Sequence, residues 1–420
     1  MELDRKTLMR AVVYLWFTAF LINISLHIPS FYRTQFRGDE NVYRLLSRTM
    51  GWDLSNYSTA KNPVISKWPN TIYRQPVFHH GPLLPYIMKF GGIFGKSTSA
   101  ALIFENLTMA IFFLHLLVLY RRLSIPPGWQ ILGSFAVALG PLLLFSTTRI
   151  HTDALTGIYI ACAIISFIEA LETRSTTWSI WSGIMFAAAL NLRLTAIVSL
   201  PLIVFCQIIY LSAMQYKKVG LAPGEWSFGR DTLKFEYWKV ITIVSLIIVT
   251  VGLEHFYRLF ATYGSIFPWD FMQSDQTSSW VQFAQTRTRG KNFANLLLLI
   301  PLFTVFFLPQ TWRTMCNGLM RGAWGAIYAI FSLYLLLVLY AFSYTEMRFF
   351  AAATPMFYCC LPWIMAQGKI KSLPFQLCLI AVSLCVMIAA DYREVVVRSN
   401  EVFGIVPVIY ELIPPLRKYW

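Results

Sequence analysis

Apolar stretches of about 20 residues recur along almost the whole chain, and they restrict its fold more than any other feature of the sequence. The chain is 57% hydrophobic and only 13% charged, whereas a soluble domain carries roughly 25% charged residues. Backbone groups in lipid must form hydrogen bonds within their own segment, so the spans should be helices and not open strands. The sequence therefore predicts an all-α, polytopic membrane protein.

Hydropathy predicts about eleven transmembrane helices, although residues 177–214 can be divided differently. They are expected at 11–29, 98–120, 128–147, 153–171, 177–191, 194–214, 238–257, 293–310, 323–343, 349–367 and 373–390. The first of them lacks a small-residue cleavage site, so we expect it to remain as a helix. Short loops rich in Lys and Arg fall mainly on one side, which the positive-inside rule assigns to the cytoplasm. The N-terminus is then inside, and GDENVY at 38–43 faces the extracytoplasmic or lumenal side.

The extracytoplasmic loops contain structure of their own. In the first loop, 30–97, DENVYRLLSRTM has the spacing of a short amphipathic helix, and FHHGPLLPYIMKFGGIFG that of an interfacial helix. A second large loop is expected at 258–292. Residues 1–390 are thus predicted to form one transmembrane domain, followed by a tail at 391–420.

Charge and cysteine content favour no other class of protein. The net charge is +15, but the basic residues are scattered through short loops, which membrane topology and lipid phosphates explain better than nucleic acid. Most of the seven cysteines lie inside apolar runs, without the spacing of a disulfide framework or a zinc site. No Gly-rich nucleotide-binding motif follows a strand-like run.

The pair Asp39–Glu40 is the first candidate for chemistry. An acidic pair in a loop is commonly just solvated. A carboxylate at the boundary of water and lipid can also accept the proton of an incoming hydroxyl or amine, as a general base does.

Three further clusters fall on the same predicted side. Arg149 and Asp153, with His151 between them, are spaced to share a helix face, so they form either a structural ion pair or a site for an anionic lipid head group. Arg193 interrupts two apolar runs, and it either lines a cavity or reaches the interface. Glu346 and Arg348 precede the tenth expected span, where Arg348 either anchors the helix end or binds a phosphate.

His79 and His80 form a histidine pair just before the second predicted helix of the first loop. Adjacent histidines without a second cluster are weak evidence for a metal, and the alternative is a role in positioning that helix. A divalent cation stays open as a cofactor, and no other cofactor is predicted.

The four clusters together favour a substrate with a lipid phosphate and a neutral sugar. Arginines would hold the phosphate and stabilise the charge that grows on it as it departs, while the acid acts on the nucleophile. These residues also resemble motifs of the GT-C membrane glycosyltransferases, most closely the branch of protein O-mannosyltransferases and aminoarabinose transferases. The similar segments are the DE pair, HHGPLLPYIMKFGGIFG, STTRIHTDALTG, the run around NLRLT, and EMRFFAAATP.

The resemblance implies an inverting glycosyltransferase that uses a polyprenyl- or dolichyl-phosphate sugar and a lipid, glycan or protein acceptor. Asp39 would deprotonate or orient the acceptor with help from Glu40, and Arg149 and Arg348 would contact the donor phosphate. The chain departs from the family pattern at Gly81, where the HPPL segment has its first proline. The expected location is a bacterial or archaeal plasma membrane, or the endoplasmic reticulum of a eukaryote.

Two other readings stay open. A lipid or solute transporter would place its charges near the middle of the membrane and often shows a duplicated half. The second alternative is a noncatalytic relative of the same fold.

Overall fold

The regular elements among the described residues are all helices, and one isolated bridge joins His80 to Arg193. The structure is a computed structural model that describes residues 5–32, 39–58, 80–140, 143–144, 147, 149–199, 235–264, 309–320, 323–342 and 351–367. The predicted all-α fold is confirmed for these residues. In chain order the elements are α1 Arg5–His27, η1 Ile28–Tyr32, α2 Asp39–Thr49, α3 Leu83–Ile93, α4 Ser97–Arg122, α5 Pro127–Leu139, α7 Asp153–Thr173, α8 Thr176–Leu192, η4 Leu194–Ser199, α10 Phe235–Tyr263, α14 Pro309–Met320, α15 Trp324–Phe342 and α16 Thr354–Gln367.

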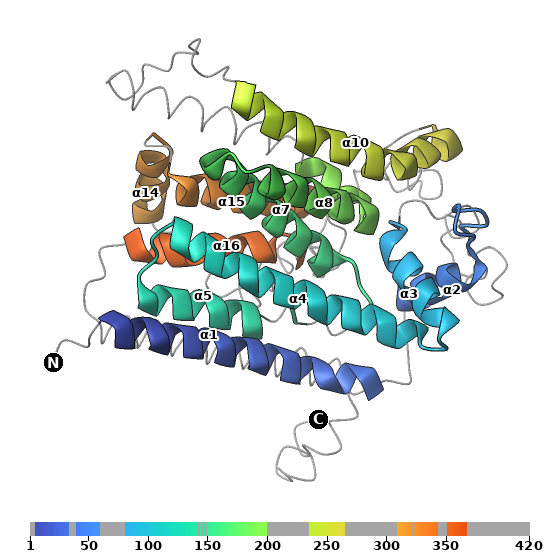
Figure 1. Cartoon of the computed structure of the whole chain (residues 1–420), viewed down its shortest axis with the longest axis horizontal. Helices are drawn as coiled ribbons and strands as arrows, with labels where there is room; N and C mark the ends of the chain where they lie inside the picture. The colour runs from blue at the N-terminus through green and yellow to red at the C-terminus, as the bar shows by residue number, and fades with distance from the viewer. Residues whose placement is uncertain are drawn as a thin grey trace, which may run out of the picture.

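Helix α7 forms the centre of the bundle. Every residue from Asp153 to Leu171 is buried, which is typical of a helix that is apolar all round and enclosed by others. It contacts α4, α8 and α16, while α1 packs on α5 and α10 packs on α8. Figure 1 shows these helices running roughly side by side, with α1 along one edge and α10 along the opposite edge.

Local sequence explains where the chain reverses between α7 and α8. Arg174 ends α7 in the left-handed conformation, with φ of 56°, a common geometry at a helix C-terminus. Ser175 then caps α8, because its side chain accepts a hydrogen bond from the Trp178 N–H. The start of α7 and the end of α8 consequently lie at the other end of the bundle, where α2 and α3 also lie (Figure 1).

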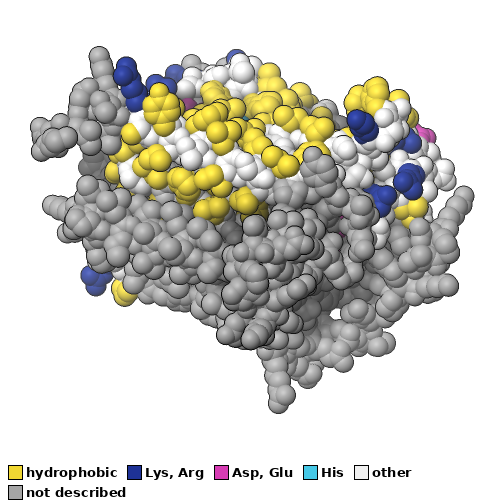
Figure 2. Space-filling view, turned by 90° about the horizontal axis from the view of Figure 1, so that it is seen from below, with side chains coloured by type: hydrophobic (Ala, Val, Ile, Leu, Met, Phe, Trp, Pro, Cys, Tyr) yellow, Lys and Arg dark blue, Asp and Glu magenta, His cyan; other side chains and the backbone are white. Residues whose placement is uncertain are grey.

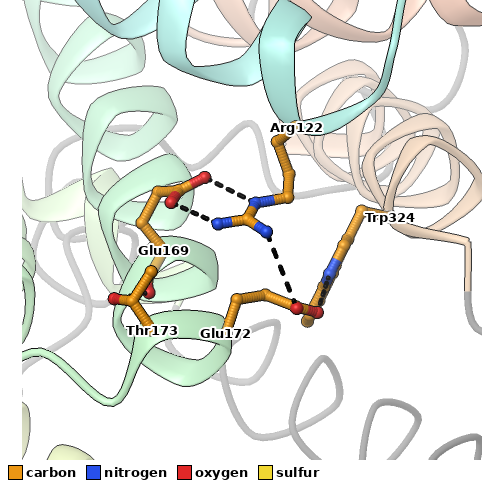
Figure 3. A network of polar contacts seen from close by, with 5 residues as sticks. All are labelled: Arg122, Glu169, Glu172, Thr173 and Trp324. Atoms are coloured by element: carbon orange, nitrogen blue, oxygen red, sulfur yellow. Dashed lines mark hydrogen bonds and ion pairs between the residues drawn. The ribbon is translucent and has the colours of Figure 1, made fainter.

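A polar network joins three helices at the end of the bundle away from α2 (Figure 3). Arg122 at the end of α4 donates Nε and Nη2 to the carboxylate of Glu169 on α7, at 2.7 and 2.6 Å. Glu172 on α7 lies 3.7 Å from the same guanidinium and accepts the indole N–H of Trp324 on α15 at 2.9 Å. This fork-to-carboxylate geometry fixes the register of α4, α7 and α15.

The described helices cover eight of the eleven expected spans. Three of these described helical segments are long and apolar enough to cross a membrane: Arg10–His27, Ser97–Arg122 and Asp153–Thr173. Helix α5 is shorter than its expected span because it ends at Leu139, and the expected span 194–214 begins with the 3-10 helix η4. Most of the expected span at 293–310, and all of that at 373–390, lie outside the described residues, as do most of loop 258–292 and the tail at 391–420. The number of eleven spans and the domain boundaries stay predictions.

The surface of α1 is apolar, as a lipid-facing helix requires. Its exposed side chains include Tyr14, Phe17 and Leu21. Figure 2 shows an apolar band on the face seen from below Figure 1, with described Lys and Arg side chains toward its two ends. Charged residues that flank an apolar band of this kind lie at head-group depth in a bilayer. The prediction of an integral membrane protein is confirmed.

Candidate active site

Helix α2 positions the predicted acidic pair. Val42 and Leu46 are fully buried and hold one face of the helix against the protein, so the first turn is buried as well. Asp39 and Glu40 occupy that turn, where carboxylates complement the helix dipole, and they are only 6% and 2% exposed. A buried carboxylate is costly unless it accepts hydrogen bonds. Glu40 does so, because its Oε1 accepts the Ile150 N–H at 3.1 Å.

That hydrogen bond joins α2 to the turn before α7. The turn contains Arg149, whose carbonyl accepts the His151 N–H at 2.8 Å, and His151 is itself buried. Because α7 begins only at Asp153, Arg149 and Asp153 do not share a helix face, and the expectation that they do is wrong.

Asp153 forms an ion pair with Arg193. The distance from Asp153 Oδ1 to Arg193 Nη1 is 2.5 Å, and the two side chains are 1% and 15% exposed. Arg193 follows the last residue of α8 in an extended conformation, with φ of −155° and ψ of 135°, so the chain leaves the helix at this point. The arginine that the sequence placed between two apolar runs is therefore bound to the start of α7.

His80 and Gly81 lie against the end of α8. His80 forms the isolated bridge with Arg193, and the Gly81 N–H donates to the Leu192 carbonyl at 3.2 Å. A Cβ on Gly81 would lie 2.1 Å from the carbonyl oxygen of Asn191, which no real Cβ contact allows. A proline would also lack the donating N–H. The departure from the HPPL pattern at Gly81 thus has a physical cause.

Two buried tyrosines hold His80 from other sides. The Tyr43 hydroxyl on α2 lies 3.0 Å from His80 Nδ1 and 2.8 Å from Thr152 Oγ1. The Tyr57 hydroxyl donates to the His80 carbonyl at 2.8 Å. Burial, and then the negative charge of Asp39, raises the pKa of Tyr43 far above its usual value, so Tyr43 is a neutral phenol at physiological pH.

The structure therefore brings together six of the predicted site residues. Asp39 and Glu40 come from α2, His80 from the segment before α3, Arg149 and Asp153 from the turn and first residue of α7, and Arg193 from the end of α8. Two others, Glu346 and Arg348, lie outside the described residues, as does His79.

Sequence reasoning missed Tyr43, Tyr57 and Thr152, which connect these segments. A signal for Tyr43 was available, because it lies between Val42 and Leu46 on the apolar face of the predicted helix. A buried tyrosine there needs a partner for its hydroxyl. Nothing in the sequence indicated that Thr152 and His80 are its partners.

A metal site finds no support among the residues that the structure describes. No group of three or more His, Cys, Asp or Glu side chains in them could hold a metal ion. One ring nitrogen of His80 already faces the Tyr43 hydroxyl. The divalent cation remains a prediction.

The fold is similar to those of solved proteins that share little sequence identity with the chain. It is similar to an oligosaccharyltransferase from Archaeoglobus fulgidus, solved with zinc and sulfate, with a TM-score of 0.52, 15% identity, and coverage of 90% of this chain and 53% of that chain. A structure of the same organism's oligosaccharyltransferase AglB, with an inhibitory peptide and a dolichol-phosphate, gives a TM-score of 0.50 and 14% identity over 91% of this chain and 56% of that one. ArnT from Cupriavidus metallidurans, bound to undecaprenyl phosphate, gives a TM-score of 0.48 and 14% identity over 89% and 62%.

Residues 79–221 match the family model for dolichyl-phosphate-mannose-protein mannosyltransferases. The match contains His80, Arg149, Asp153 and Arg193. No curated protein sequence matches the chain. The predicted resemblance to GT-C glycosyltransferases, in the branch similar to protein O-mannosyltransferases, is confirmed by the family match and the fold. The chain spans about half the length of the Archaeoglobus enzyme.

Proposed function

We propose that the protein is an inverting glycosyltransferase that moves a sugar from a polyprenyl or dolichyl phosphate to an acceptor on the extracytoplasmic or lumenal face of the membrane. The observation that carries this proposal is the joining of the acid-bearing helix α2 to the Arg149 turn, through Glu40 and Ile150, beside the Asp153–Arg193 pair. An acid that can accept a proton and cations that can hold a phosphate are thereby brought to one end of the bundle.

The relatives support the substrate class. The matching family is described by its use of dolichyl-phosphate mannose, and the AglB structure of similar fold contains a dolichol-phosphate. A lipid phosphate is a chemically competent leaving group, so no nucleotide is needed as the sugar donor.

Asp39 is the proposed general base. It takes the proton from the acceptor hydroxyl or amine while that atom bonds to the anomeric carbon of the sugar, and the bond from this carbon to the phosphate oxygen breaks. The lipid phosphate departs with the bonding electrons. A single displacement of this kind inverts the configuration at the anomeric carbon.

Glu40 is proposed to assist Asp39 by holding helix α2 against the turn before α7. Its carboxylate holds the backbone of Ile150, so it fixes the distance between Asp39 and the turn that contains Arg149. Asp153 in turn orients Arg193.

Arg149, Arg193 and Arg348 are proposed to bind the donor phosphate. A guanidinium carries five N–H donors in a planar fork, so Arg193 can serve Asp153 and a phosphate oxygen together. Support for Arg348 comes from the chain that follows it. A Cβ on Gly157, one turn into α7, would lie 2.1 Å from the Ala352 carbonyl oxygen, so the backbone at 351–353 lies directly against the start of α7. Arg348 precedes Ala352 by four residues, a reach of roughly 14 Å at most.

The test is turnover of purified protein with a panel of polyprenyl-phosphate sugars, measured as released lipid phosphate. Asp39→Asn should lower turnover by about 10²–10⁴-fold, because it keeps the size of the side chain and removes its basicity. Asp53→Asn is the matched control, since Asp53 is an exposed acid of the same loop that accepts hydrogen bonds from Ser55. Equal turnover of the Asp39 variant and the wild type would exclude Asp39 as the base.

The transporter alternative is tested with the same purified protein reconstituted in vesicles. Its motivation is that Glu105 and His115 are buried inside the span α4. His115 is accounted for by packing, because its ring contacts Ser166 Oγ and accepts the Trp181 indole N–H at 3.0 Å. Movement of the lipid-linked sugar across the bilayer, with no transfer to any acceptor, would favour the transporter.

A further inference from the structure

We propose that Tyr43 is a positioning residue that sets the tautomer of His80, placing the hydrogen of the neutral ring on Nε2. This inference rests on the proposed function for its consequence, since His80 is bridged to Arg193, one of the residues proposed to bind the donor phosphate. The assignment of the tautomer can be tested without any activity.

The Tyr43 hydroxyl lies between two hydrogen-bond partners. Tyr43 is buried, and its oxygen lies between His80 Nδ1 at 3.0 Å and Thr152 Oγ1 at 2.8 Å. The two rings meet edge to face, with centroids 5.2 Å apart and an angle of 88° between their planes. Tyr43 on α2 therefore orients the ring of His80, which lies 37 positions later in the chain. The same hydroxyl contacts Thr152, the residue just before α7.

A phenol has one hydrogen, so Tyr43 donates to one of these two neighbours and accepts from the other. An imidazole nitrogen is a stronger base than an alcohol oxygen, and a phenol is a better donor than an alcohol. The better donor therefore pairs with the better acceptor, so Tyr43 donates to His80 Nδ1 and Thr152 donates to Tyr43. The charged groups that act on the Tyr43 hydroxyl are Asp39, Arg193 and Asp153.

The consequence concerns what His80 presents to a ligand. When Nδ1 accepts a hydrogen bond, the hydrogen of the neutral ring is on Nε2. The ring is then a neutral donor, suited to an oxygen of the donor phosphate, whereas an Nε2 lone pair would repel that oxygen. His80 is fixed through its backbone as well, by the bridge to Arg193 and by the hydroxyl of Tyr57.

The Tyr57 hydroxyl provides the matched control. Tyr43 and Tyr57 are both buried and both bind His80, but Tyr57 donates to the backbone carbonyl and Tyr43 contacts the ring. Tyr43→Phe and Tyr57→Phe remove the same atom from the same neighbourhood. Only the first should change the ring.

The experiment is solid-state NMR of the full chain in bilayers, with ¹⁵N-labelled histidine and with His80→Gln to identify the His80 signals among the six histidines. We expect His80 in the wild type and in Tyr57→Phe to show an unprotonated Nδ1 and a protonated Nε2. Tyr43→Phe should give a mixture of tautomers. A hydrogen on Nδ1 in the wild type, or the same change in both variants, would overturn the assignment.

Thr152 tests the same relay from its other side. Thr152→Ser keeps the hydroxyl and Thr152→Val removes it. Both should leave the His80 tautomer unchanged, because Tyr43 donates its one hydrogen to His80 Nδ1 and only accepts from Thr152. With a working donor, Tyr43→Phe should lower kcat by about 10–100-fold, the range known for losing a partner that orients a metal-binding histidine, and Tyr57→Phe should not. Unchanged kcat in Tyr43→Phe would refute the positioning role. Absence of turnover in the wild type would count against the proposed function alone.

Discussion

Replacing Arg193 by Met should destabilise the protein far more than breaking an exposed ion pair does. Arg193→Met leaves Asp153 buried, at 1% exposure, without the guanidinium that lies 2.5 Å away. At that separation, an effective dielectric of about 20 gives an attraction of about 7 kcal/mol before the desolvation of both groups is subtracted. Removing one partner of a buried pair costs about 3–5 kcal/mol, because the remaining charge is uncompensated. We expect a loss in that range.

The assay is chemical unfolding of purified protein in detergent or bilayers, followed by tryptophan fluorescence. The double variant Arg193→Met with Asp153→Asn should recover part of the loss, because neither charge is then buried alone. Arg258→Met is the matched control, since Arg258 pairs with Glu254 at 2.8 Å but the side chains are 35% and 65% exposed. It should cost less than about 1 kcal/mol. A double variant as unstable as Arg193→Met, or equal losses at Arg193 and Arg258, would refute the reasoning.

Four further outcomes are expected. Gly81→Pro should destabilise the protein by roughly 3 kcal/mol or more, although proline is the residue of the HPPL pattern. The proline ring would meet the Asn191 carbonyl, and the N–H of residue 81 would be lost. Unfolding midpoints equal to the wild type would contradict this. Arg122→Met should lower the stability by about 3 kcal/mol and leave kcat of the folded enzyme unchanged, because its partners lie at the far end of the bundle; a selective loss of kcat would be unexpected. Arg348→Ala should raise the KM for the lipid donor by about tenfold or more with the acceptor KM little altered, and an unchanged donor KM would place the phosphate elsewhere. The pKa of Tyr43 is raised in the folded state, so the contribution of Tyr43 to stability is complete below the unfolded value of 10.0 and declines as pH rises above it. Tyr43→Phe should therefore flatten the fall in unfolding free energy at alkaline pH. An equally steep fall in the variant would argue against the buried phenol.

The position of the acidic pair could be predicted because it depends on short-range pattern. The spacing of Val42, Leu46 and Met50 indicates a helix with one apolar face, and the acids precede that face directly. Hydropathy in the same way located helices in eight of the expected spans. These features are set by residues within a few turns of each other.

The pairing of Asp153 with Arg193 could not be predicted, because it depends on where two helices end. The sequence suggested Arg149 as the partner, on the assumption that one helix contains both residues. The structure begins α7 at Asp153 and ends α8 just before Arg193, so residues 40 positions apart meet. The contact of Tyr43 with Thr152, 109 positions away, is of the same kind.

Gly81 is a different case, in which a departure from a family pattern concealed a structural requirement. On sequence alone, the glycine was only a departure from the HPPL pattern directly after His80. In the fold, the backbone of α8 approaches so closely that only a residue without a side chain, and with an N–H, fits there.

The most direct measurement is a cryo-EM structure of the purified protein with polyprenyl phosphate added. The proposed site predicts density for the phosphate in contact with the guanidinium of Arg149 or Arg193, at the end of the bundle where α2 holds Asp39. Phosphate density at the opposite end, beside Arg122, or within the bundle away from these arginines would contradict it.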